Sequence, residues 1–294
     1  MRVWVVGAAG MLGSEVVTAL RIAGITVAAS DREVDITDEK AVTEYLDKAS
    51  EPDRIVNCAA WTAVDAAEKN EQAAFALNAN APGILAKAAA DCGARLLHIS
   101  TDYVFDGKAS QPYRPDDPPA PCSVYGRSKL AGEEAIRNVS TAHVIIRTAW
   151  LYGANGPNFV ATMLRLMGER EEIGVVADQH GAPTCAVDLA AAIRTIVTAP
   201  AVHCGTWHYT NTGQTTWYGF AQAIQEMALS AGLLKNTCRI IPLTTAEYPT
   251  AAARPAYSVI DTTTFQRDWD LSIPHWRESL ATYLTSLRER PCKT

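Results

Sequence analysis

The spacing of three glycines near the N-terminus constrains the fold most strongly. Gly7, Gly10 and Gly13 form a G-x-x-G-x-x-G pattern directly after the apolar run 2–6. A strand that turns sharply into a helix, with its backbone amides close to a phosphate, needs glycine at such points. The alternative is a glycine-rich turn with a purely structural role. Because the pattern lies between a predicted strand and a predicted helix, it favours a dinucleotide-binding turn.

The remainder of the first half alternates short apolar runs with longer Ala-rich stretches. Predicted strands cover residues 2–6, 25–29, 54–59, 95–100 and 143–148. Predicted helices cover residues 11–23, the neighbourhood of 42–46, and residues 73–92 and 128–138. Continuous apolar strands separated by helices are typical of a parallel sheet covered on both faces. We therefore predict a doubly wound α/β fold with a Rossmann sheet.

The second half is less regular. Helices are expected over 158–170, 187–197, 217–231 and 275–288, a strand over 206–210, and a Pro-rich loop over 112–121. We expect residues 1–150, with about 185–215, to form the NAD(P)-binding domain. Residues of about 151–184 and 216–294 are then expected to form a smaller mixed α/β region that binds the substrate.

Composition excludes several classes of function. The 294 residues carry a net charge of -6 without a basic block, which argues against nucleic acid as a partner. We find no apolar run of about 18 residues, so no membrane span is expected, and the first apolar run is too short for a secretory signal. Seven scattered cysteines without a C-x-x-C pair predict reduced thiols and a cytoplasmic location.

The end of the second predicted strand bears on the choice of cofactor. It reads Ser30-Asp31-Arg32. An acidic side chain there accepts a hydrogen bond from the ribose 2′-hydroxyl of NAD, whereas an arginine neutralises the 2′-phosphate of NADP. The sequence offers both groups, so it favours NADPH and leaves NADH usable, and a solvated loop pair is the alternative. Asp35 and Ile36 follow in the loop and are expected to edge the adenine.

A tyrosine and a lysine four residues apart suggest a proton donor. Tyr125 and Lys129 would share one face of a helix. An unperturbed phenol has a pKa of about 10, and a nearby ammonium lowers that pKa. Thr101, at the end of the fourth predicted strand, can hold a carbonyl oxygen in line, and Asn78 lies in the preceding helix. These groups suit a ketone reductase; the alternative is a surface tyrosine beside a surface lysine.

Nine segments carry a resemblance to a known family. They are GAAGMLG (7–13), DRIVNCAAWTAVDAAE (53–68), LNANAPGILAKAA (77–89), STDYVFDG (100–107), YGRSKLAGE (125–133), RTAWLYG (147–153), NFVATMLRL (158–166), DQHGAPT (178–184) and ARPAYSVID (253–261). On these segments the chain resembles the extended short-chain dehydrogenases/reductases. Within them it is most similar to the dTDP-4-dehydrorhamnose reductase family, and STDYVFDG followed by Y-x-x-x-K-x-x-G-E is the most specific part.

The resemblance implies a reaction and roles for single residues. NAD(P)H would deliver hydride to C4 of dTDP-4-dehydro-6-deoxy-L-mannose, with Tyr125 as the proton donor. Lys129 would bind the nicotinamide ribose, and Thr101 would adjust the proton transfer. Further implied contacts with the cofactor are Gly10, Met11, Leu12, Ala59, Ala60 and Thr62. Implied contacts with the nucleotide sugar are Val64, Asp65, Thr101, Asp102, Tyr103, Trp150 and Arg254.

Assembly and rival functions stay open at this point. Some relatives form dimers around Mg²⁺ through acidic residues near both chain ends. Glu15 is present here, but the tail 288–294 is partly basic, so we predict no metal site and keep a homodimer as an option. Two other functions remain: a reductase or epimerase of another nucleotide sugar, and an NADP-binding regulatory subunit resembling that of methionine adenosyltransferase.

Overall fold

The computed structural model describes residues 1–48, 51–200 and 203–289. Its centre is a six-stranded sheet in which all neighbouring strands run parallel, in the order β10-β5-β4-β3-β1-β2. The strands are β1 (Arg2–Val6), β2 (Thr26–Ser30), β3 (Arg54–Asn57), β4 (Arg95–Thr101), β5 (His143–Thr148) and β10 (Gly205–His208). The predicted doubly wound α/β fold is therefore confirmed.

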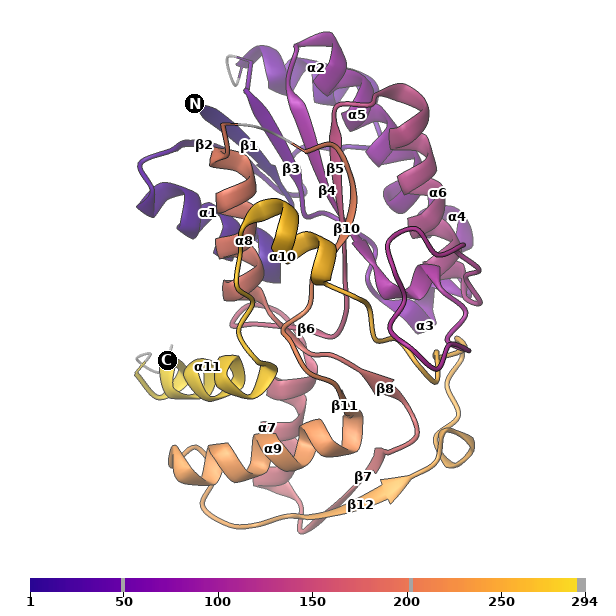
Figure 1. The fold of residues 1–294 in the computed structure, drawn as a ribbon, viewed down its shortest axis with the longest axis vertical. Helices are drawn as coiled ribbons and strands as arrows, with labels where there is room; N and C mark the ends of the chain where they lie inside the picture. The colour runs from indigo at the N-terminus through magenta and orange to yellow at the C-terminus, as the bar shows by residue number, and fades with distance from the viewer. Residues whose placement is uncertain (49–50, 201–202, 290–294) are drawn as a thin grey trace.

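Helices cover both faces of this sheet (Figure 1). One face carries α1 (Met11–Ile22), α8 (Ala186–Thr198) and α10 (Thr263–Trp269), and the other carries α2 (Glu39–Lys48), α5 (Ala81–Asp91) and α6 (Val124–Val139). Successive residues of β1 point to opposite faces, as the pleat requires. Val3 and Val5 pack in the first core, whereas Trp4 and Val6 pack in the second.

The chain changes direction across the sheet between β1 and β3. From β1 it moves outward to β2, and from β3 it moves to β4 and β5 on the other side. In an open α/β sheet, the crevice beyond the carboxyl ends of the strands at such a switch point binds ligands. The glycine turn after β1 lies at this crevice.

Sequence periodicity placed most of the helices correctly and missed local interruptions. The predicted helix 73–92 consists of α4 (Glu71–Phe75), a π-helical turn η1 (Ala76–Asn80) and α5. Helix α6 begins at Val124 rather than at 128 as predicted, because Ser123 Oγ accepts a hydrogen bond from the Gly126 amide and caps it. The Pro-rich segment 112–121 contains no helix or strand, as predicted.

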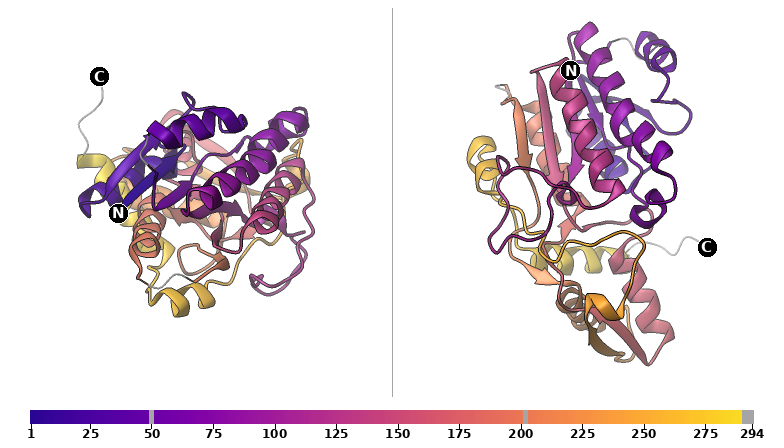
Figure 2. Two further views of the ribbon diagram at one scale, coloured as in Figure 1. Left: turned by 90° about the horizontal axis from the view of Figure 1, so that it is seen from above. Right: turned by 90° about the vertical axis from the view of Figure 1, so that its right-hand side faces the viewer.

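A second cluster of buried side chains lies beyond the carboxyl edge of the sheet. The helices that carry it lie in the lower part of Figure 1 and of the right-hand view in Figure 2. It is formed mainly by three helices, with Tyr152, Phe220 and Leu280 among its fully buried members. These helices are α7 (Phe159–Glu169), α9 (Trp217–Ser230) and α11 (Trp276–Glu289). Helix α10 instead returns to the sheet, where Phe265 and Trp269 pack in the first core.

Short strand pairs tie this second cluster together, and the sequence did not reveal them. They are β6 (Leu151–Tyr152) with β9 (Thr184–Cys185), β7 (Glu172–Val176) with β12 (Arg239–Leu243), and β8 (His180–Gly181) with β11 (Thr215–Thr216). Four of these six strands have only two residues, which is too short for a periodic pattern. In the described ranges, we find no helix of the length and apolarity that crossing a membrane requires.

Candidate active site

The glycine turn has the geometry that a bound pyrophosphate requires. Gly7 adopts a φ of 74°, and a Cβ there would lie 2.7 Å from the backbone nitrogen of Ala59. A Cβ on Gly13 would overlap the Gly7 carbonyl. Helix α1 has Gly10 at its N-cap, without a side-chain cap and without an acidic residue in its first turn. Its first amides therefore remain available to an anion, and Met11 and Leu12 follow in that turn.

Of the three predicted cofactor residues at the end of β2, two make hydrogen bonds within the protein and one does not form an ion pair with any described residue. Ser30 is buried and its Oγ accepts a hydrogen bond from Trp4 Nε1 at 2.8 Å. Asp31 Oδ2 accepts from the Ala9 amide at 2.8 Å, so its carboxylate fastens the glycine turn. Arg32 is exposed, and no acidic side chain of the described residues pairs with it. The guanidinium of Arg32 therefore has no carboxylate partner among the described residues.

The next loop places one of the predicted adenine contacts in the core. Ile36 is 4% exposed and packs with the second core of the sheet. Asp35 is exposed, and its Oδ1 accepts hydrogen bonds from the amide and the hydroxyl of Thr37. These hydrogen bonds hold the pKa of the Asp35 carboxyl below its usual value.

Asn78 organises the loop that follows β3. Its Oδ1 accepts from the Trp61 amide at 2.8 Å, and its Nδ2 donates to the Trp61 carbonyl and to Ser128 Oγ. Asn78 thereby fixes this loop to helix α6. Ala59 and Ala60 are half-buried at the start of the loop and Thr62 is exposed, so backbone and methyl groups form this wall of the crevice.

Tyr125 and Thr101 meet beyond the carboxyl end of β4. Thr101 Oγ1 donates to Asp102 Oδ1 at 2.9 Å while it accepts from the Tyr103 amide at 3.2 Å. Burial raises the pKa of Tyr125 to about 12, and the neighbouring Thr101 hydroxyl opposes this shift. The phenol is therefore protonated near neutral pH.

Asp102 and Tyr103 complete this side of the site. Asp102 is buried within the short 3-10 turn η2 (Asp102–Val104). Burial raises the pKa of its carboxyl to about 6, although hydrogen bonds with Thr101 and Ser258 oppose the shift. The Tyr103 ring packs edge-on against Tyr125, with 5.4 Å between the ring centroids. Both residues lie beside Tyr125, and their implied contacts with the nucleotide sugar stay predictions.

Lys129 shares a face of α6 with Tyr125 but makes other contacts. It is 1% exposed, and its Nζ donates to the Ile99 carbonyl at 2.7 Å and lies 3.1 Å from His98 Nε2. Burial lowers the pKa of Lys129 to about 8, although the charge of Glu133 opposes the shift. Lys129 is not among the groups that shift the pKa of Tyr125 in this structure, so the expectation that Lys129 lowers this pKa stays a prediction.

Trp150 belongs to a cluster of aromatic side chains. Trp150 adopts a φ of 48° and stacks on Trp217, with 3.5 Å between the ring centroids and 10° between the planes. Phe159 packs on the far side of Trp217, and a Cβ on Gly181 would overlap the Trp150 ring. Trp150 was predicted from the resemblance, whereas Trp217 was missed. An N-terminal helical tryptophan gives no local signal of such a stack.

The remaining predicted substrate residues come from two distant segments. Val64 and Asp65 begin the short helix α3 (Val64–Ala67). Arg254 Nη2 pairs with Asp65 Oδ2 at 2.5 Å, and Asp65 Oδ1 accepts from the Ala252 amide. These contacts fasten the segment around 250–256 to the loop after β3. Arg254 is therefore present at the site and has a carboxylate partner in this structure.

Asn57 and His98 are polar residues of the site that the sequence analysis did not single out. They occupy paired positions, Asn57 at the end of β3 and His98 in the middle of β4, and are both 0% exposed. A buried polar side chain near the carboxyl ends of two adjacent predicted strands was the available signal, because such groups need partners within the protein. Cys58 follows Asn57, and burial raises the pKa of its thiol to about 12, which makes it a poor nucleophile.

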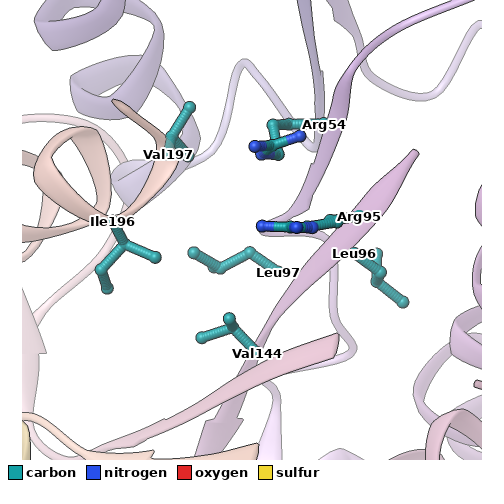
Figure 3. Close-up of a pocket in the computed structure, with 7 residues that line it drawn as sticks. All are labelled: Arg54, Arg95, Leu96, Leu97, Val144, Ile196 and Val197. Carbon is teal, nitrogen blue, oxygen red and sulfur yellow. The ribbon is translucent and has the colours of Figure 1, made fainter. Parts of the chain in front are cut away.

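Two cavities lie away from this crevice. Figure 3 shows one of about 10 Å³, where Arg54 and Arg95 lie side by side above apolar side chains that include Leu97 and Ile196. Arg54 and Arg95 begin β3 and β4, so this cavity lies at the amino edge of the sheet. A larger cleft of about 470 Å³ is lined by segments 110–112, 210–214, 257 and 259–262. Neither contains a residue predicted for the site.

The described residues contain no group of three His, Cys, Asp or Glu side chains arranged to hold a metal ion. Residues 290–294 of the tail considered for Mg²⁺ lie outside the described residues. The structure therefore offers no ligand set on which a metal site can be built from residues 1–48, 51–200 and 203–289.

A glycine turn at the switch point, together with a tyrosine and a lysine on α6 facing a strand-end hydroxyl, is the arrangement of extended short-chain dehydrogenases/reductases. The protein is an oxidoreductase of this class. Residues 1–289 match the family described as RmlD substrate binding domain, and the chain belongs to this family.

Relatives of the chain are sugar-nucleotide enzymes. It is 44% identical to a dTDP-4-dehydrorhamnose reductase of Streptomyces griseus, covering 94% of this chain and 91% of the relative. It is 42% identical to a probable dTDP-4,6-dihydroxy-2-methyloxan-3-one 4-ketoreductase of Streptomyces antibioticus, over 95% and 93%. Among solved structures, dTDP-4-dehydrorhamnose reductase from Bacillus anthracis in complex with NADP aligns with a TM-score of 0.91 and 38% identity, over 97% and 99%.

Proposed function

We propose that the protein reduces the C4 ketone of dTDP-4-dehydro-6-deoxy-L-mannose to form dTDP-L-rhamnose, with NADPH as the preferred reductant. The observation that carries the proposal is that Tyr125, on α6, lies beside Thr101 and Asp102 at the carboxyl end of β4. The 44% identity to a dTDP-4-dehydrorhamnose reductase supports the choice of sugar nucleotide.

The cofactor would lie along the crevice between β1 and β3. The free amides at the start of α1 would hold its pyrophosphate, and the unpaired guanidinium of Arg32 would contact a 2′-phosphate. Bound NADPH supplies the hydride. Lys129 would turn from the Ile99 carbonyl to the hydroxyls of the nicotinamide ribose, since its Nζ already lies beside the end of β4.

Proton transfer would be the task of Tyr125. Because its pKa is raised to about 12, the phenol carries its proton at neutral pH and can donate it to the C4 oxygen as negative charge develops there. Thr101 donates its single hydroxyl proton to Asp102 in this structure. To hold the C4 oxygen in line, the hydroxyl would turn that proton from Asp102 to the oxygen.

The sugar nucleotide would bind between the sheet and the second cluster, which α7, α9 and α11 form. Trp150, supported by Trp217, presents an indole face to the site. Arg254 would exchange its contact with Asp65 for the diphosphate of the substrate. We accordingly propose the division of the chain expected from the sequence, with the amendment that helix α10 packs on the sheet.

The test is NADPH oxidation followed by absorbance, with the keto sugar generated from dTDP-glucose by the upstream enzymes. The proposal expects loss of NADPH and dTDP-L-rhamnose as the product, and a parallel series with NADH measures the preference. NADPH binding without oxidation would overturn it. An epimerase would leave the cofactor unchanged, and a regulatory subunit would hold a partner protein without turnover.

A second candidate has one observation in its favour. The 42% identity to a 4-ketoreductase of another sugar is close to the 44% identity to the rhamnose enzyme. A reductase of another dTDP-linked 4-keto sugar would use the same Tyr125 chemistry. Comparing kcat/KM for both keto sugars decides between them. Homodimer formation and a cytoplasmic location stay predictions, which size-exclusion chromatography and cell fractionation would test.

A further inference from the structure

Behind Lys129, two buried polar side chains form a line that leads away from the cofactor crevice. Asn57 on β3 and His98 on β4 occupy paired positions, and both are fully buried. Asn57 Nδ2 lies 3.0 Å from His98 Nδ1, and His98 Nε2 lies 3.1 Å from Lys129 Nζ. Each contact joins nitrogen to nitrogen, so one nitrogen in each pair must donate a hydrogen bond and the other must accept it.

The backbone sets the direction of the first contact. The Ala59 amide donates to Asn57 Oδ1 at 3.0 Å, which leaves Asn57 Nδ2 facing the imidazole. An amide NH₂ can only donate, so His98 Nδ1 must accept and carries no proton. Burial holds the pKa of His98 well below its ordinary value. A neutral His98 therefore carries its single proton on Nε2.

The direction of the second contact follows. His98 Nε2–H points at Lys129 Nζ, and an ammonium group has no lone pair with which to accept it. An uncharged amine satisfies both neighbours, because it accepts from His98 Nε2 and donates to the Ile99 carbonyl at 2.7 Å. The lowering of the Lys129 pKa to about 8 by burial agrees with this assignment.

The other titratable groups around Lys129 do not offset this arrangement. On α6, Tyr125 lies one turn before it and holds its proton, while Glu133 lies one turn after it and is paired with Arg147. At the end of β3, burial raises the pKa of the Cys58 thiol to about 12, so that it stays neutral. His98 is neutral on β4. Among the described residues, Glu133 is the carboxylate that acts on the amine, and Arg147 already compensates its charge.

We propose that His98 is a positioning residue for Lys129: fixed by Asn57 in the Nε2–H form, it donates to the Lys129 amine and holds it uncharged in the conformation described here. Lys129 would then gain one proton from solvent when it turns to the ribose of the cofactor. The inference rests on the proposed function in one respect, namely that Lys129 contacts that ribose.

The tautomer is measured directly on the wild-type protein. Two-bond ¹H–¹⁵N correlation spectra of ¹⁵N-histidine-labelled protein distinguish Nδ1–H from Nε2–H rings, and His98→Gln assigns the signal among the six histidines. The proposal expects the Nε2–H form above the Lys129 pKa of about 8, where the amine is uncharged. An Nδ1–H form, or a doubly protonated ring, would overturn it without any use of activity.

The charge of Lys129 is measured through binding. NADPH titrations by calorimetry, in buffers of different ionisation enthalpy, count the protons taken up. Above the Lys129 pKa of about 8, uptake should approach one proton per site, and below it uptake from this group should vanish. NADPH affinity should fall up to about tenfold per pH unit above that value. Affinity that stays level across this range contradicts the proposal.

A variant reverses the tautomer. In Asn57→Asp, the carboxylate can accept from the Ala59 amide and from His98 Nδ1–H, so that Nε2 becomes an acceptor for the ammonium. The alkaline fall in NADPH affinity should then move upward by about one pH unit or more. The double variant Asn57→Asp/His98→Gln is the control, because a shift that persists there comes from the added charge alone and contradicts a role for His98.

These readouts separate the two proposals. A protein with the Nε2–H tautomer and proton uptake, but without turnover of either keto sugar, refutes the proposed function and leaves the inference intact. A protein that makes dTDP-L-rhamnose but carries the Nδ1–H tautomer refutes the inference alone.

Discussion

Lys129 and Glu133 lie one turn apart on α6, are 1% and 0% exposed, and have opposite electrostatic surroundings. Glu133 accepts hydrogen bonds from Arg147 Nε and Nη2 at 2.9 and 2.7 Å, from Ser100 Oγ and from Arg137. Burial opposes its charge, yet these contacts lower the pKa of Glu133. Lys129 has a carbonyl and an imidazole as neighbours, and its pKa falls to about 8.

The difference in surroundings gives Glu133 a structural role and leaves Lys129 able to change its charge. A buried charge with a full set of partners is fixed in one protonation form, and removing one partner strands the other. A buried amine without an opposing charge sits near its titration point and can change its charge when a ligand arrives. Tyr125, Lys129 and Glu133 share one face of α6. The proposed reactive residues are the two at the end of this face that lies near the carboxyl edge of β4, whereas Glu133, further along the helix, stabilises the fold.

The largest effect is expected at the reacting end of this face. Tyr125→Phe removes the proton donor and leaves the ring, so kcat should fall by about 10²–10⁴-fold. The Kd for NADPH, measured by fluorescence titration, should stay within about twofold because no cofactor contact is lost. Unchanged turnover in this variant would remove Tyr125 from the mechanism.

Lys129→Met should separate function from stability. Loss of the amine should lower kcat by about 10²-fold and weaken NADPH binding by about tenfold, as expected for one hydrogen bond to a charged group. Met has a similar length and needs no partners, so the free energy of unfolding near neutral pH should not decrease. A loss of stability with normal NADPH binding would make Lys129 a structural residue.

Glu133→Gln should show the opposite behaviour. It leaves Arg147 buried without its counter-charge, which should cost about 3 kcal/mol in the free energy of unfolding by guanidinium denaturation. Glu134→Gln, the same change at an exposed neighbour, is the matched control and should cost little. Because the pKa of Glu133 is lowered in the fold, the loss of stability in Glu133→Gln should shrink as the pH falls below the pKa of glutamate in the unfolded chain. Equal losses for both variants would refute the pairing argument.

The smallest effect is expected at Ser100. Its hydroxyl donates to Glu133 but does not supply charge. Ser100→Ala should therefore destabilise the fold by about 1 kcal/mol and leave kcat within about twofold. A loss as large as that of Glu133→Gln would mean that the hydroxyl, and not the guanidinium of Arg147, holds the carboxylate.

The sequence predicted the strands of the central sheet well and the short strands of the second cluster poorly, because only the former carry a local pattern. Strand β1 is continuous, and four of its five residues are apolar and buried; it is followed by helix α1, whose apolar face packs in the first core. The glycine pattern also marks its own conformation. By contrast, β6 and β9 have two residues each and pair across about 30 residues of chain, so that only tertiary structure makes them strands. The π-helical turn at Asn78 is likewise set by its hydrogen bonds to Trp61 and Ser128.

Within the site, spacing could identify which residues meet but not how they are charged. The four-residue interval brought Tyr125 and Lys129 onto one face, as predicted. The reference pKa values then suggested an ammonium that tunes a phenol, whereas the structure buries both groups and directs the amine to His98 and Ile99. Desolvation and tautomer depend on neighbours from β3 and β4, and no local pattern along the chain encodes them.

The most direct test of this account is the pH dependence of the free energy of unfolding, as the difference between wild type and Lys129→Met. The pKa of Lys129 is about 8 in the fold and 10.5 in its ordinary range. Between these values the unfolded chain binds more protons, so wild-type stability should rise with pH, relative to the variant, by up to about 3 kcal/mol. Below pH 8 the difference should be level. A difference that stays level from pH 8 to 10.5 would mean that Lys129 keeps an ordinary pKa, and would contradict the claim that the site holds an uncompensated amine.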